Sequence, residues 1–100
     1  MAEDESAVPT YEIRKQAHFD RELSLLVPDI ERAVEIGNGI RFILRHFPEA
    51  GQPAGINTPV PVYTYFIRGT TSNPPLIVFY AFGAGRVLIM GIEQTIDQDA

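Results

Sequence analysis

The chain of 100 residues has no cysteine and only one lysine, Lys15, and these shortages exclude whole classes of site. Without cysteine there is neither a disulfide nor a thiolate ligand for a metal ion. None of the patterns HExxH, CxxC, GxSxG, P-loop or GxGxxG occurs, so we expect no metal and no cofactor. The formal net charge of −5 also disfavours broad, non-specific attraction to nucleic acid or to anionic membranes.

Long apolar runs are missing as well. No run approaches the roughly 18 to 20 residues that a helix needs to cross a membrane. The first residues include the acidic Glu3, Asp4 and Glu5, whereas a secretory signal begins with basic and then apolar residues. We expect an acidic, disordered segment over residues 1–9 and one domain over residues 10–97, in a soluble, cytoplasmic protein.

The first half of the chain is patterned as a short strand followed by helices. Alternation predicts the strand over residues 10–16, and helical spacing begins at Ala17. Pro28 interrupts this spacing, so we expect two helices, the second from about Asp29, with one kinked helix as the alternative. The second helix carries an apolar stripe, made of Ile30, Ala33, Val34, Ile40, Ile43, Leu44 and Phe47.

Within that second helix, "GNG" at residues 37–39 is locally unfavourable, because glycine destabilises a helix interior. It predicts either a break or a close approach to the sheet. Pro48 and Gly51 then end the helix and open a loop rich in proline and glycine.

The second half is patterned as strands over residues 62–69, 76–82 and 86–92, joined by short turns. Short links predict a three-stranded antiparallel meander. The order strand, two-helix hairpin, meander predicts an α+β fold with the helices on one face of the sheet.

The last two strands are apolar on both sides. Alternation places Leu76, Val78, Tyr80 and Phe82 opposite Ile77, Phe79 and Ala81, and places Leu88, Met90 and Ile92 opposite Val87 and Ile89. Two helices can cover only one face of the sheet. The other face is therefore expected to bind a partner or a second copy, or to be covered by the C-terminal segment or the long loop.

Candidate catalytic groups are few. The only histidines are His18 and His46, and the position of His46 favours stabilisation of a helix C-terminus over catalysis. Arg68 and Arg86 could meet on the open side of the sheet with Tyr63, Tyr65 or Tyr80, where they would bind phosphate or stack a base. The alternative is that both arginines only solvate strand ends.

The order of elements, the loop "FPEAGQPA" and the final hairpin "PPLIVFYAFGAGRVLIMGI" resemble the RelE/ParE toxin superfamily. The resemblance covers nearly the whole chain from Thr10 onward. It implies the toxin-like component of a bacterial type II toxin–antitoxin pair, neutralised by an antitoxin that packs across the sheet and helices. One branch of the family cleaves mRNA on the ribosome without a metal, and the other poisons DNA gyrase.

The resemblance favours protein binding over catalysis here. The cleaving branch uses several basic residues and a tyrosine on the sheet, but Ile77 stands where it places an arginine. Glu93, Gln94 and Thr95 stand where both branches usually carry basic residues.

The expected antitoxin-binding residues are Phe79, Tyr80, Phe82, Leu88 and Met90. The alternatives are a metal-independent endoribonuclease using Arg68, Tyr80 and Arg86, and a non-toxic interaction module or homo-oligomer.

Overall fold

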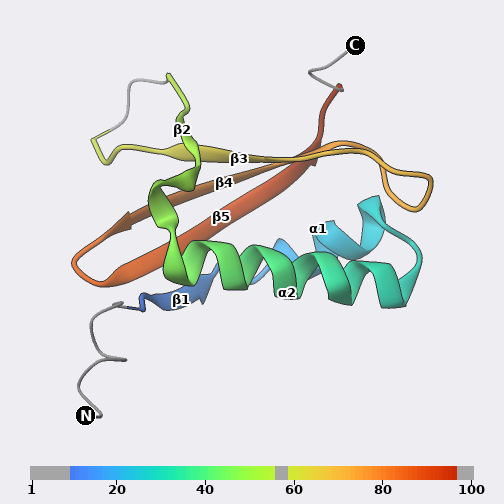
Figure 1. The fold of residues 1–100 in the computed structure, drawn as a ribbon, viewed down its shortest axis with the longest axis horizontal. Helices are drawn as coiled ribbons and strands as arrows, with labels where there is room; N and C mark the ends of the chain where they lie inside the picture. The colour runs from blue at the N-terminus through green and yellow to red at the C-terminus, as the bar shows by residue number, and fades with distance from the viewer. Residues whose placement is uncertain (1–9, 56–58, 97–100) are drawn as a thin grey trace, which may run out of the picture.

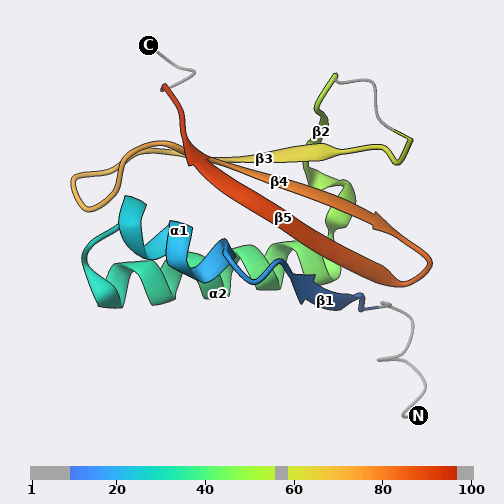
Figure 2. The ribbon, with the colours of Figure 1, turned by 180° about the vertical axis from the view of Figure 1, so that it is seen from behind.

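The computed structural model describes residues 10–55 and 59–96, which form an α+β fold of two layers. Figures 1 and 2 show both α-helices on one face of a twisted sheet. The elements are β1 (Glu12–Lys15), α1 (Phe19–Leu26), α2 (Ile30–His46), the 3₁₀ turn η2 (Pro48–Ala50), β2 (Gln52–Pro53), β3 (Tyr63–Ile67), β4 (Leu76–Gly83) and β5 (Arg86–Gln94). The expectation of a disordered segment over residues 1–9 lies outside the described residues.

The sheet has five strands in the order β1-β5-β4-β3-β2, whereas the sequence predicted four, one over residues 10–16 and three in the meander. β3, β4 and β5 pair antiparallel, as the meander required. β1 adds to β5 in parallel, with Ile13 opposite Val87, and makes the sheet mixed. The two-residue β2 adds to β3 and contains Pro53, which an edge strand tolerates because its N–H side can face solvent. These edge pairings join residues distant in the chain, so local alternation could not predict them.

Two separate helices form, because Pro28 prevents continuation and Asp29 starts a new helix. The Asp29 side chain accepts hydrogen bonds from the backbone N–H groups of Glu31 and Arg32, at 3.1 and 3.3 Å. These bonds satisfy donors that have no partner within the helix. The chain then runs back along α1 as α2 (Figure 1).

The predicted break at residues 37–39 does not occur, because α2 is continuous through them. The predicted close approach is to α1 and not to the sheet: a Cβ on Gly37 would lie 3.4 Å from Cδ2 of Leu23. Gly39 has nothing within 4 Å of such an atom.

The predicted apolar stripe of α2 is only partly buried. Ala33, Ile40 and Leu44 are in the core, together with Ile36, which the prediction omitted. Ile30, Val34 and Phe47 are instead exposed, at 77%, 55% and 49%. The buried stripe is narrower than the apolar one because α2 rests on the sheet along one side only.

The core lies between the helices and the facing side of the sheet. It contains Leu76, Val78 and Tyr80 of β4, all fully buried, which share one side of the strand as the alternation predicted. The expectation that Tyr80 binds a partner is therefore not supported by its position. The other members of the core are Phe19, Leu23, Val27, Ala33, Ile36, Ile40, Leu44, Val87, Ile89 and Ile92.

The predicted alternation of the last strand is wrong beyond Ile89. Tyr80 pairs with Ile89 and Phe79 pairs with Gly91, so Met90 is an extra residue on β5, a β-bulge. The bulge shifts the phase of the strand by one residue. Ile92 is therefore buried on the same side as Ile89, although the prediction placed it opposite.

Candidate functional site

The candidate site is the face of the sheet that the helices leave uncovered. Its centre consists of five apolar side chains on β3, β4 and β5, which we call the open face: Phe66, Ile77, Phe79, Ala81 and Leu88. They share one side because each lies one residue away from a core position in paired register. Phe66, Ile77, Phe79 and Ala81 are partly accessible, and Leu88 is 39% exposed.

A charged rim borders the open face along β1 and the start of β5. Glu12 pairs with Arg14 at 2.9 Å and with Arg86 at 3.5 Å. A hollow of about 290 Å³ lies next to this rim, lined by Val60, Ala81, Phe82, Gly83, Arg86 and Leu88. An apolar centre with a polar border is the usual composition of a protein-binding surface.

The expected partner-binding residues divide between the two faces of the sheet. Phe79 and Leu88 lie on the open face, whereas Tyr80 is fully buried on the helix side. Phe82 also lies on the helix side, where its ring contacts Tyr11 edge-on at 6.2 Å. Of these four residues, Phe79 and Leu88 are therefore the two that lie on the open face.

Met90 sits at the bulge. The extra residue interrupts the β4–β5 ladder, and the Met90 carbonyl accepts a hydrogen bond from Nε2 of His18 at 3.2 Å. His18 is also 3.9 Å from a carboxylate oxygen of Glu22. In this structure His18 anchors the start of α1 to the bulge. A glycine inside a strand, here Gly91, was the signal that could have predicted the bulge.

The three candidate catalytic residues are not brought together. Arg68 follows Ile67, which pairs with the first residue of β4, while Arg86 pairs with the last, Gly83. Seven residues of extended strand separate these ends, about 23 Å at the rise of a β-strand. Tyr80 lies on the opposite face, so no single small substrate could contact all three.

The Tyr80 hydroxyl forms hydrogen bonds within the fold. It donates a hydrogen bond to the carbonyl of Pro48 and accepts one from the backbone N–H of Gly51 at 2.9 Å. Burial raises the pKa of this hydroxyl above its ordinary value, an effect that the hydrogen bond from Gly51 opposes. Such a group is a poor general base or nucleophile near neutral pH.

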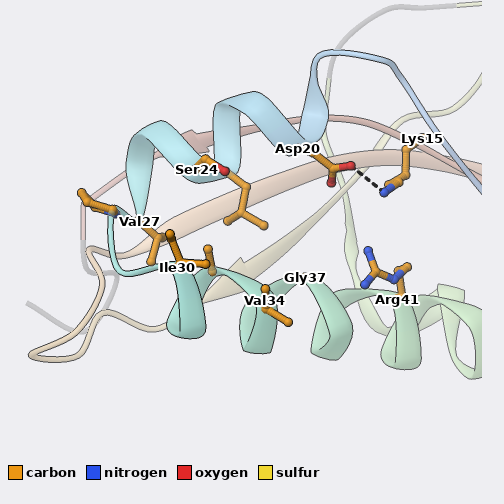
Figure 3. A pocket seen from close by; sticks show the side chains of 11 residues that line it. Lys15, Asp20, Ser24, Val27, Ile30, Val34, Gly37 and Arg41 are labelled. Atoms are coloured by element: carbon orange, nitrogen blue, oxygen red, sulfur yellow. Dashed lines mark hydrogen bonds and ion pairs between the residues drawn. The ribbon is translucent and has the colours of Figure 1, made fainter.

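A second surface lies between the two helices, as Figure 3 shows. It is a hollow of about 290 Å³ with exposed Ile30 and Val34 on the α2 side and Ser24 on α1. At one end Lys15 pairs with Asp20 at 2.8 Å, and Arg41 reaches toward this pair from α2 (Figure 3). Its apolar walls and charged end are better suited to binding a peptide side chain than to catalysing a reaction.

In the part of the chain that the structure describes, no three His, Asp or Glu side chains gather as ligands for a metal ion. Among the same residues, no helix has the length and apolar character required to cross a bilayer. Comparisons with models of known families, with curated proteins and with solved structures found no match.

Proposed function

We propose that this chain is the toxin-like component of a bacterial type II toxin–antitoxin pair and that it acts by binding a protein. The resemblance to the RelE/ParE superfamily is the reason for proposing a toxin–antitoxin pair, and DNA gyrase is the candidate target. The open face would contact that target, and the antitoxin would neutralise the chain by covering the open face and the hollow between the helices. The observation that carries the proposal is the open face itself, an apolar surface with a charged rim.

Protein binding is favoured over RNA cleavage by where the polar groups lie. Arg68 and Arg86 stand at opposite ends of β4, and Arg86 is paired with Glu12. The Tyr80 hydroxyl already forms hydrogen bonds with the backbone of Pro48 and Gly51. A metal-independent ribonuclease needs its acid, base and phosphate ligands at one reacting phosphate.

The proposal is tested by inducing the chain in a bacterial host and recording growth. We expect arrest with the unmodified chain and rescue by Leu88→Glu, because a charge on the open face opposes burial against a partner. Leu25→Glu is the matched control, since Leu25 is 73% exposed on α1, away from the open face. Circular dichroism of both variants checks that each remains folded.

Two further results separate the alternatives. If Arg68→Ala combined with Arg86→Ala abolishes arrest while Leu88→Glu does not, the ribonuclease replaces the protein-binding toxin. If expression of the unmodified chain is harmless, both toxin functions fail. A non-toxic interaction module or homo-oligomer then remains, and analytical ultracentrifugation distinguishes these two.

A further inference from the structure

The strand β3 has one edge that the rest of the described chain covers only in part. β4 pairs with all five residues of β3 on one side, whereas β2 pairs with only the first two on the other side. Figure 1 shows β2 beside one end of β3. The chain before Gln52 is held on the helix side, where the Tyr80 hydroxyl accepts a hydrogen bond from Gly51 at 2.9 Å. Within the described residues, this edge therefore has no paired strand from Tyr65 to Ile67.

The backbone groups of Phe66 point out of this edge. The carbonyl of Val62 accepts a hydrogen bond from the N–H of Ala54 at 2.8 Å, on the side where β2 lies. Because alternate residues of a strand direct their N–H and C=O to the same side, Thr64 and Phe66 face that side as well. Thr64 stands opposite Gln52, but Phe66 lies beyond the end of β2. In the part of the chain that the structure describes, no hydrogen bond occupies the outward N–H and C=O of Phe66.

A hollow of about 210 Å³ lies between this edge and α2. It is lined by Arg32, Ile36, Gly39, Ile40, Ile43, Tyr65 and Ile67. In a strand added to the edge, the two residues that flank the one opposite Phe66 direct their side chains toward this hollow. The guanidinium of Arg32 is already engaged, since it donates to Asn73 at 3.1 Å and pairs with Glu35 at 2.8 Å. The hollow is therefore better suited to aliphatic side chains than to a carboxylate.

We propose that the free edge of β3 binds an extended segment of a partner protein as an added antiparallel strand. One residue of the segment exchanges two hydrogen bonds with Phe66, and aliphatic side chains on either side of that residue enter the hollow. β2 supports this occupant, because it already adds to the same edge in antiparallel register.

The position of β2 also limits the shape of the occupant. A second copy of the chain, paired antiparallel about Phe66, would bring its Arg68 opposite Thr64, where Gln52 already lies. The partner must instead present a strand that ends or turns away beside Gln52. The pairing uses the backbone of Phe66, whereas the proposed function uses the side chains of the open face. Either one can therefore fail without the other.

The test uses a peptide with blocked ends, Ser-Thr-Val-Thr-Val-Thr-Ser, in which two valines flank the central threonine. We expect it to shift the backbone amide NMR signals of Phe66, Ile67 and Ile43 in the full chain. The matched control peptide carries an N-methyl group on the central threonine, which removes one N–H and keeps both valines. It should bind about 10-fold more weakly, because one hydrogen bond is lost and the methyl group meets the edge.

Two variants of the chain test the edge itself. Phe66→Pro removes the outward N–H, and an edge strand tolerates proline where the N–H faces solvent. Phe66→Ala is its matched control, because it loses the same ring but keeps the N–H. We expect the peptide to bind Phe66→Ala and not Phe66→Pro. Gly39→Leu, which adds a side chain to the lining of the hollow, should also prevent binding. If Phe66→Pro fails to fold, the N-methylated peptide decides.

Four results would overturn the proposal. Equal binding of the two peptides, or of the two Phe66 variants, would show apolar contact without strand pairing. Shifts centred on Phe79 and Leu88 would place the peptide on the open face instead. Shifts at Phe66 that grow with protein concentration in the absence of peptide would identify a second copy as the occupant. No shift at the solubility limit of the peptide would show that the edge binds no strand.

Discussion

The hydroxyl of Tyr80 accepts a hydrogen bond at 2.9 Å from the backbone N–H of Gly51 and donates one to the carbonyl of Pro48. One side chain of the central strand β4 thereby holds the segment that leaves α2 and enters β2. This relationship fixes the path of the chain between the helical layer and the sheet edge. The same two hydrogen bonds make the Tyr80 hydroxyl a poor candidate for a catalytic group.

Removing this hydroxyl tests its structural role. Tyr80→Phe leaves the Pro48 carbonyl and the Gly51 N–H without their buried partner, and we expect a loss of about 1–3 kcal/mol in the free energy of unfolding. Urea denaturation of Tyr80→Phe and of the unmodified chain measures this difference in the free energy of unfolding. Tyr63→Phe is the control, because its ring packs against Tyr80 but its hydroxyl bonds to no described residue. Equal losses in both variants would show that the hydroxyl contributes nothing specific.

The same hydroxyl predicts a dependence of stability on alkaline pH. Burial raises the pKa of Tyr80 above 10.0 in the folded state. Its contribution is therefore complete below pH 10.0. Above that value the unfolded chain loses the proton first and binds fewer protons than the folded chain, so the free energy of unfolding falls as pH rises. Urea denaturation between pH 9 and pH 11 should show a shallower decline for Tyr80→Phe, whereas parallel declines would contradict the assignment.

Replacing two of the glycines with alanine should change the stability of the fold in opposite directions. A Cβ on Gly51 would lie 2.3 Å from the Tyr80 hydroxyl oxygen and 2.4 Å from the Thr64 carbonyl oxygen, so Gly51→Ala should destabilise by about 1–3 kcal/mol. Gly39 has open space around it in the helix interior, so Gly39→Ala should stabilise by up to about 1 kcal/mol. Thermal unfolding of both variants compares them. A stabilised Gly51→Ala protein would disprove the close packing.

The β4–β5 turn offers a stabilising substitution. Ala84 and Gly85 both have positive φ, 52° and 78°, as a two-residue type I′ hairpin requires. Alanine in this left-handed conformation costs roughly 1–2 kcal/mol, and asparagine tolerates it better. Ala84→Asn should therefore raise the melting temperature, and Ala84→Val should lower it. Similar melting temperatures for the two variants would show that the turn adjusts its backbone.

Local sequence patterns predicted the helices and the central strands because their signals lie within a few residues. Pro28 and Asp29 separate the helices by the chemistry of one missing donor and one capping carboxylate. The alternation on β4 correctly divided Val78 from Phe79 because the strand pairs regularly on that side. The short turn at residues 84–85 predicted the final hairpin for the same reason.

The candidate site was less predictable, since it depends on which face the helices cover. Alternation separated Phe79 from Tyr80 and Phe82, but no local signal showed which of the two sides the helices cover. The bulge at Met90 reversed the phase of the last strand and moved Ile92 into the core. The proposed meeting of Arg68 and Arg86 failed because hairpin connectivity puts them at opposite ends of β4.

By itself the sequence determined the α+β order of elements and the apolar character of both sheet faces, because helix and strand periods, prolines and turn residues act over short distances. Only the tertiary structure decided which face is open, how β1 and β2 extend the sheet, and that Tyr80 bonds to Gly51. Those outcomes depend on pairings between residues far apart in the chain, where packing and hydrogen bonding select one arrangement among several that the same local pattern permits.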